Sequence, residues 1–187
     1  MKEDIKLALD VLKNGGVILY PTDTIWGLGC DATNAEAVKK VYEIKQRSDS
    51  KSMLVLLDNP GYLTYYVKEV PEIAYDLIEL ADKPLTIIYP GAQKLAENLI
   101  AADGSIGIRF PNDDFCKQLI GRFKKPIVST SANISGKPSP QHFQDIDKEV
   151  IEKVDFVVKY RQDDFSPSQP SSIIKLSAKG EIVIIRQ

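Results

Sequence analysis

Two short apolar runs of the sequence are each followed at once by side chains that carry hydroxyl or amide groups. The run at residues 17–20 leads into the loop PTDTIWGLG, and the run at residues 126–128 leads into STSANISGKPSP. Such residues often serve only as turn and cap formers that bond their own backbone. At the carboxyl end of a buried strand they can instead present neutral donors and acceptors to a ligand. The residues concerned are Thr22, Thr24, Ser129, Ser131, Asn133 and Ser139.

Cations elsewhere in the chain favour the ligand-binding interpretation. Lys45, Arg47 and Lys51 fall within seven residues at the end of an expected helix and lead into an apolar run. In a last helical turn they could simply complement the helix dipole, but three together predict an anion site. Arg109 lies near the end of one further strand-like run, and Arg186 lies just past another. Cations combined with neutral donors suit a polyanion such as a nucleoside triphosphate, whose reaction needs positioning and charge neutralisation more than a strong acid or base.

Other catalytic classes lack their motifs in this sequence. There is no Gly-x-Ser-x-Gly elbow, no Walker A loop and no Gly-x-Gly-x-x-Gly fingerprint. The single histidine, His142, has no acidic residue that would obviously orient it, and Cys30 and Cys116 lack a metal-ligand spacing. We therefore expect no protein-held metal and no nucleophilic serine hydrolase.

The periodicity of apolar residues predicts alternating helices and strands that deliver these side chains. Segments 60–66 and 92–100 stay open between helix and ordered loop. Thr33 with Glu36 predicts a capping box, and Asn112 is the expected cap of a later helix. The alternation, with a hairpin at its end, predicts a mixed sheet in an α/β or α+β domain. Helices are expected over residues 5–12, 34–46, 71–81, 113–120 and 141–153, and strands over 17–20, 53–57, 84–89, 105–111, 126–128, 155–158, 171–176 and 181–185.

Length and charge restrict the class of protein. A chain of 187 residues fits one domain, here 1–187, and can bury a sizeable core. The formal net charge of -2 provides no global basic field, so binding of polyanions must rely on a local cluster. No apolar run approaches the roughly 18 residues of a membrane span, so we expect no membrane contact and a cytoplasmic protein with reduced thiols.

Five motifs follow one another along the chain, namely PTDTIWGLG, IKQR at residues 44–47, PLT at 84–86, GIRFP at 107–111 and STSANISG at 129–136. Together they resemble the YrdC-like family, whose best-known activity is threonylcarbamoyl-AMP synthesis. The likeness covers nearly the whole chain, and the combination of Lys-x-Arg with Ser-x-Asn in this order is its most specific part. It implies an α/β, α+β-like fold with a twisted mixed sheet flanked by helices and a concave, positively charged cleft.

The resemblance also implies an activity. L-threonine, bicarbonate and ATP would be joined into L-threonylcarbamoyladenylate with release of pyrophosphate, for the N6-threonylcarbamoyladenosine modification at position 37 of tRNAs. The enzyme class would be a nucleotidyltransferase, Mg²⁺ would arrive with ATP, and the product would pass to the TsaD/TsaB/TsaE transferase complex. Matched residue by residue, threonine would be held by Thr24, Arg109 and Ser129, and ATP by Arg47, Lys51, Ser105, Ser131, Asn133, Ser139 and Arg186, with Lys45 and Arg47 as the catalytic cations.

Alternatives from the same fold remain open at this point. One is a YciO-like paralogue without this activity, and another is an RNA-binding protein that uses the same groove for tRNA or double-stranded RNA. A third is a carbamoyl-transfer module like the related domain of hydrogenase maturation proteins. The near-neutral charge disfavours the RNA-binding alternative.

Overall fold

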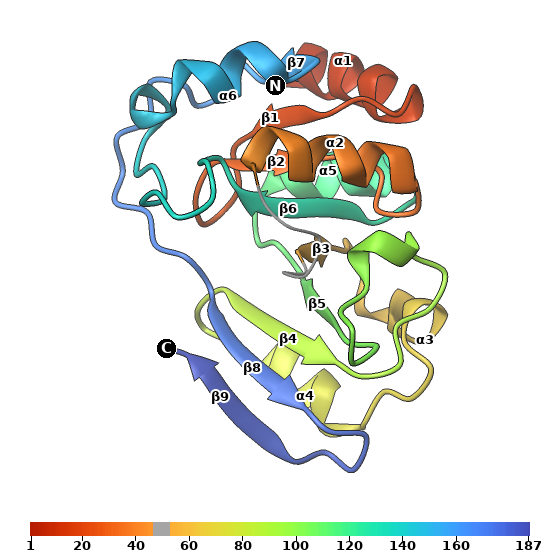
Figure 1. Cartoon of the computed structure of the whole chain (residues 1–187). Helices are drawn as coiled ribbons and strands as arrows, with labels where there is room; N and C mark the ends of the chain where they lie inside the picture. The colour runs from red at the N-terminus through yellow and green to blue at the C-terminus, as the bar shows by residue number, and fades with distance from the viewer. Residues whose placement is uncertain (47–52) are drawn as a thin grey trace.

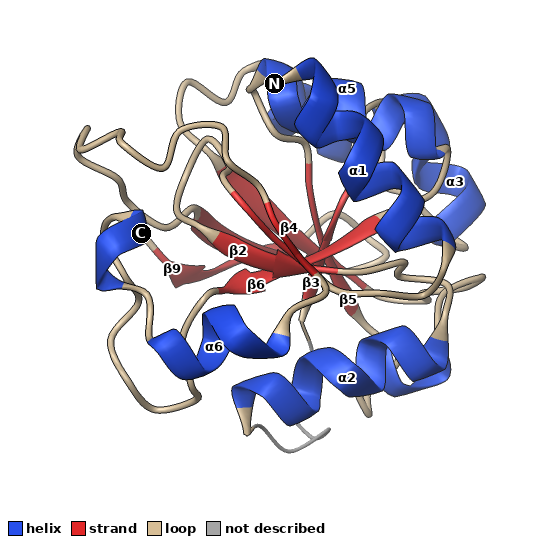
Figure 2. Ribbon diagram, turned by 90° about the horizontal axis from the view of Figure 1, so that it is seen from above, coloured by secondary structure: helices blue, strands red, loops and turns tan. Residues whose placement is uncertain are grey.

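The computed structural model describes residues 1–46 and 53–187, which form a mixed sheet with helices on both faces (Figures 1 and 2). Its strand order is β7-β1-β2-β6-β3-β5-β4-β8-β9. The pairs β1–β7, β3–β5 and β4–β8 are parallel, and the other neighbours are antiparallel. The strands are β1 (Ile18–Tyr20), β2 (Gly27–Gly29), β3 (Leu54–Leu56), β4 (Leu85–Tyr89), β5 (Ile106–Arg109), β6 (Ile127–Ser131), β7 (Phe156–Val157), β8 (Ser172–Leu176) and β9 (Ile182–Arg186).

The helices lie in two layers, which confirms the predicted sheet flanked by helices. In Figure 2, α1 and α5 cover one face of the sheet, and α2 and α6 cover the other. Their apolar faces bury against the sheet because their hydrophobic residues recur at helical spacing. The helices are α1 (Lys2–Lys13), α2 (Ala35–Lys45), α3 (Leu63–Tyr66), α4 (Ile73–Glu79), α5 (Asp114–Phe123) and α6 (Lys148–Lys153).

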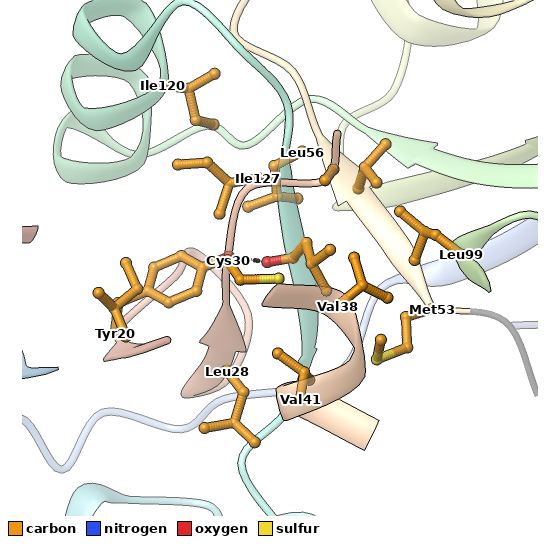
Figure 3. Close-up of a cluster of buried hydrophobic side chains, with 14 of the residues drawn as sticks. Tyr20, Leu28, Cys30, Val38, Val41, Met53, Leu56, Leu99, Ile120 and Ile127 are labelled. Atoms are coloured by element: carbon orange, nitrogen blue, oxygen red, sulfur yellow. Dashed lines mark hydrogen bonds between the residues drawn. The ribbon is translucent and has the colours of Figure 1, made fainter. Parts of the chain in front are cut away.

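Side chains of α2 and the central strands form the part of the core that supports the candidate site. Val38 and Val41 of α2 lie against Leu28 and Met53, beside the start of β3 (Figure 3). All four are at most 3% exposed. This packing fixes the end of α2, which carries Lys45, and the start of β3 relative to β2.

Two predicted helix caps are wrong by one residue. Asn34, not Thr33, caps α2, because its side-chain oxygen accepts from the backbone N–H groups of the second and third helical residues. The Thr33 hydroxyl instead donates to Asp31 at 2.6 Å. In the same way Asp113 caps α5, and Asn112 lies one residue outside it. Each cap directly follows a side chain that could also cap a helix, and in the first case that side chain, Thr33, bonds Asp31 two residues before it.

Strand boundaries near the polar loops also differ from prediction. The strand predicted at residues 126–128 continues to Ser131, so the hydroxyls of β6 lie within the strand and not in the loop after it. Residues 27–29, predicted as loop, form β2 between β1 and β6. A Cβ at Gly29 would lie 2.6 Å from the Tyr20 ring and 2.9 Å from the Val128 carbonyl oxygen. Only glycine permits that close approach, although glycine is a poor strand former.

The remaining segments are mostly as predicted. Segment 60–66 is a 3₁₀ turn, Pro60–Tyr62, followed by α3, and segment 92–100 is a loop with a 3₁₀ turn at Glu97–Leu99. The helix expected over 141–153 is reduced to a 3₁₀ turn at Phe143–Asp145 and to α6. The terminal hairpin is confirmed as β8 and β9. Across residues 1–46 and 53–187, every helix is too short or too polar to cross a bilayer.

Candidate functional site

A cavity of about 270 Å³, the central cavity, lies where β6 ends beside the start of β3. Its lining comes from the loop after β1, from β2, β3, β5 and β6, from the loop after β6, and from β8 and β9. Strand pairing explains the meeting, because Leu54 of β3 is in register with Ser129 of β6. Six of the predicted site residues line this cavity, namely Thr24, Arg109, Ser129, Ser131, Ser139 and Arg186.

The loop after β1 presents an acceptor to this cavity. The Thr22 hydroxyl donates to the carbonyl oxygen of Ile25 at 2.8 Å and lies 2.8 Å from the Thr24 hydroxyl. Because the single proton of Thr22 is used in the first bond, Thr24 must be the donor in the second. The lone pairs of the Thr24 oxygen are therefore available to an N–H donor such as an ammonium group.

Arg109 is a buried cation at the end of β5. Only 2% of the residue is exposed, and its guanidinium forms an ion pair with Asp23. The second carboxylate oxygen of Asp23 accepts from the backbone N–H of Asn112 at 2.9 Å. A guanidinium has five N–H donors, and the bond to Asp23 is the one hydrogen bond of this side chain within residues 1–46 and 53–187. Asp23 thus orients Arg109 and leaves donors for a carboxylate or phosphate in the cavity.

Ser129 lies beside a buried phenol on the wall of the cavity. Tyr20 is 1% exposed and donates to the Val128 carbonyl oxygen at 3.3 Å. Burial raises the pKa of Tyr20 far above its ordinary range, and the hydrogen bond with the Ser129 side chain opposes this only partly. The phenol therefore stays neutral beside Ser129 and does not serve as a proton-transfer group.

Arg186 lines the cavity from β9, which is an edge strand of the sheet. Its Nε and Nη2 atoms donate to the Ser171 carbonyl oxygen at 3.1 and 2.6 Å. The Ser171 hydroxyl lies 2.7 Å from the Thr86 hydroxyl on β4. Thr86, Ser171 and Arg186 thus form a connected polar group that joins β4, β8 and β9. Arg186 is exposed apart from this contact, which suits a cation that meets a ligand from solvent.

Lys45 lies behind the cavity and is absent from its lining. The residue is 2% exposed at the end of α2, and its ammonium donates to the carbonyl oxygens of Ser131 and Asn133 at 2.5 and 2.8 Å. It also donates to Asn133 Oδ1 at 3.1 Å. The Asn133 side chain in turn accepts from the Ser131 hydroxyl at 2.5 Å and donates to Lys137. Lys45 and Asn133 together hold the loop after β6 in shape.

Among the described residues, one further predicted residue besides Lys45 and Asn133 is absent from the cavity lining. Ser105 precedes β5, at the opposite end of that strand from Arg109, and its hydroxyl donates to Asp103 at 2.5 Å. Arg47 and Lys51 lie outside the described residues. Of the residues that the structure describes, Arg109, which is paired with Asp23, and Arg186 are the cations that line the cavity.

Comparison with known proteins gives the family. The sequence profile of the Sua5/YciO/YrdC family, which carries the description "Telomere recombination", matches residues 10–187. The chain belongs to the Sua5/YciO/YrdC family. The matched residues therefore include the whole sheet and every cavity residue described above.

Three relatives illustrate the likeness. A Methanocaldococcus jannaschii protein, named provisionally as a threonylcarbamoyl-AMP synthase, is 36% identical over 191 residues, which is 100% of this chain and 88% of the relative. The threonylcarbamoyl-AMP synthase of Pseudoalteromonas translucida is 32% identical over 181 residues, 95% of each chain. The crystal structure of P. abyssi Sua5 complexed with L-threonine has a TM-score of 0.84 at 25% identity. The match includes 97% of this chain and 53% of the P. abyssi chain.

The sequence analysis did not predict two residues that belong to the site. Asp23, which orients Arg109, and Ser171, which receives Arg186, were not predicted as site residues. Asp23 stands between Thr22 and Thr24, so a carboxylate inside a hydroxyl-rich strand end was the available signal. Ser171 lies in a polar loop whose sequence carries no comparable pattern.

Proposed function

We propose that this chain synthesises L-threonylcarbamoyladenylate from L-threonine, bicarbonate and ATP, with release of pyrophosphate. The observation that carries the proposal is the central cavity, where a buried arginine, a hydroxyl acceptor and a second arginine from distant segments meet. The names of the relatives favour this function over the YciO-like and RNA-binding alternatives. P. abyssi Sua5, which has the same fold, is complexed with L-threonine in its crystal structure, although this chain spans about half of that longer protein.

Threonine is assigned to the inner end of the cavity. The donors of Arg109 that are not bonded to Asp23 suit the amino acid's carboxylate, since charge-assisted bonds to guanidinium are among the stronger hydrogen bonds in proteins. The free lone pairs of Thr24 suit its ammonium or amine. Ser129 lies beside them on the same wall. The inner end thus offers a cation for the acid group and acceptors for the amino group.

The reaction needs close positioning more than a strong base. Threonine's amine adds to bicarbonate with loss of water to form a carbamate. A carbamate oxygen then attacks the α-phosphorus of ATP, the bond from that phosphorus to the bridging oxygen breaks, and pyrophosphate leaves. This transfer of AMP makes the enzyme a nucleotidyltransferase. Carbamates decompose readily in water, so a small cavity that limits solvent favours the second step.

ATP is assigned to the outer end of the cavity. Arg186, Ser131 and Ser139 line the cavity and are proposed to meet the nucleotide, and Arg47 and Lys51 are proposed as further contacts on the basis of family resemblance. Lys45 acts through the loop that it holds and contributes positive charge near the phosphates. Mg²⁺ is proposed to enter with the nucleotide, because Mg²⁺ usually binds phosphate oxygens and water with few protein ligands.

The test is threonine-dependent release of pyrophosphate. Purified protein with ATP, Mg²⁺, bicarbonate and L-threonine should release pyrophosphate, and omission of either bicarbonate or threonine should abolish it. A reaction with carbamoyl phosphate in place of bicarbonate and threonine tests the carbamoyl-transfer alternative. Absence of threonine-dependent turnover, together with RNA binding that weakens steeply with salt, would instead support the RNA-binding alternative. The tRNA modification and the TsaD/TsaB/TsaE link are tested by adding those proteins and tRNA to the same mixture.

A further inference from the structure

A second hollow, of about 560 Å³, lies beyond the carboxyl end of β3. The central cavity uses Met53 and Leu54 at the start of β3, whereas this hollow uses Leu57 and Asp58 just after it. The two share no lining residue. We call the hollow the tyrosine–lysine pocket, because its lining includes Tyr62, Tyr65, Tyr66, Lys94, Lys124 and Lys125.

The pocket exposes aromatic rings that the core does not need. Tyr62 is 48% exposed and Tyr65 is 52% exposed, while Tyr66 is buried and meets Tyr65 edge to face at 5.0 Å. The Lys94 ammonium lies 3.6 Å from the centre of the Tyr65 ring. One face of the Tyr65 ring is thus already covered by a cation, so Tyr62 is the ring available for stacking. Exposed aromatic rings beside cations are the surface on which nucleic-acid bases stack.

Two of the lysines occupy backbone positions that favour glycine. Lys94 has φ 54° and Lys124 has φ 63°, and Lys124 is the cap residue that ends α5. Helix ends with this left-handed conformation usually carry glycine, because a Cβ is strained there. Within residues 1–46 and 53–187 the other non-glycine residues with positive φ are Gln46 and Arg161. Half of these strained residues are therefore lysines of one pocket, which indicates a use for their ammonium groups.

The charges limit what the pocket can take. Lys125 pairs with Asp31 at 2.7 Å, so Lys94 and Lys124 are the cations left to face a ligand. Asp58 adds a carboxylate to the lining. Two ammonium groups match one phosphate better than a triphosphate, and a carboxylate accepts hydrogen bonds from ribose hydroxyls or a base amino group.

We propose that the tyrosine–lysine pocket binds one nucleoside monophosphate unit. Its base stacks on Tyr62, its phosphate meets Lys94 and Lys124, and Asp58 accepts from the ribose or the base. The unit belongs either to a free mononucleotide or to a single-stranded RNA. This site lies apart from the central cavity and does not depend on the synthase activity.

The binding test is residue-resolved NMR on the intact chain, titrated separately with AMP and with a short oligoadenylate RNA. Amide shifts at residues 62–66, 94 and 124–125 report this pocket, and shifts at residues 24, 109 and 129 report the central cavity. Binding at one site is therefore detected independently of binding at the other. An affinity that rises steeply from AMP to oligoadenylate identifies an RNA strand, and a similar affinity identifies a free nucleotide. No shift at the pocket with either probe overturns the proposal.

Variants separate binding from folding. Tyr62→Leu should weaken oligoadenylate binding about tenfold, a typical effect of losing one base–aromatic stack. Lys124→Gly should raise the melting temperature, because glycine relieves the left-handed strain, and yet weaken binding about threefold with a flatter salt dependence. Tyr75→Leu on α4 and Lys39→Gln on α2 are exposed controls outside the pocket that should bind like the parent. Parental binding by both pocket variants would overturn the assignment.

Discussion

Replacing Asp23 with asparagine probes the contact that orients the buried arginine of the central cavity. The carboxylate of Asp23 pairs with Arg109 through one oxygen and accepts from the Asn112 backbone N–H through the other. An amide keeps the shape but replaces one of these oxygens with an NH₂ group that faces a donor. Asp23→Asn therefore leaves Arg109 buried without a counter-charge and one hydrogen bond unmade.

The magnitude follows from burial. The side chains of Arg109 and Asp23 are 3% and 11% exposed, so solvent screens this pair poorly. Removing one partner of a buried ion pair typically destabilises a protein by about 3–5 kcal/mol. The amide still accepts one bond, so we expect about 3 kcal/mol, which for a chain of this length is a fall in melting temperature of about 6–12 °C. The pair Lys137–Asp147, whose side chains are 55% and 44% exposed, should by contrast contribute far less to stability, because solvent screens exposed ion pairs.

Urea unfolding and calorimetry of the parent and of four variants, Asp23→Asn, Arg109→Met, their combination and Asp147→Asn, provide the test. Asp147→Asn is the matched control, since it makes the same chemical change in an exposed pair. Combining Asp23→Asn with Arg109→Met should cost less than the sum of the single changes, because the double variant no longer buries an unpaired charge. If Asp23→Asn unfolds within about 0.5 kcal/mol of the Asp147→Asn control, the buried pair does not couple as argued.

Three further outcomes are expected. Arg109→Lys should raise the KM for threonine about tenfold and the KM for ATP less than threefold, because lysine keeps the charge and loses the planar fork. Arg186→Ala should instead raise the KM for ATP more than the KM for threonine. Equal effects on both KM values in steady-state kinetics would contradict the proposed division of the cavity. The hydrogen bond from Lys175, with those from Ser105, lowers the pKa of Asp103 to about 2. This contribution to stability is present above the ordinary aspartate pKa of about 3.9 and is lost as pH falls towards 2. Lys175→Met should raise the pKa of Asp103 in an NMR titration, and an unchanged value would refute the cause. Burial raises the pKa of both cysteine thiols, so a thiol reagent near pH 8 should label neither until urea unfolds the chain, and rapid labelling of the native protein would argue against their burial.

Local patterns predicted most elements of the fold but not all their boundaries. The helices over α1, α2 and α5 and the hairpin of β8 and β9 follow from periodicity and turn residues that act within a few positions. Residues 27–29 were mistaken for loop because glycine rarely forms strands. They form β2 because they pair with β1 and β6, and the closeness of Tyr20 and the β6 backbone requires glycine at position 29. The cap at Asn34 was missed for a different reason, because the competing Thr33 hydroxyl bonds Asp31 two residues before it.

By itself, the sequence determined which chemical groups are present, that hydroxyls and cations stand at the ends of apolar runs, and which family they match. The tertiary structure decided which of them meet. Thr24, Arg109 and Ser129 come together because β2, β6, β3 and β5 are neighbours in the sheet although they are distant and out of order along the chain. The same pairing gives Arg109 its partner Asp23 and leaves Ser105 at the far end of β5. Periodicity acts over one turn or two residues and carries no information on which strands pair, so such contacts are settled only when the whole sheet buries its apolar faces.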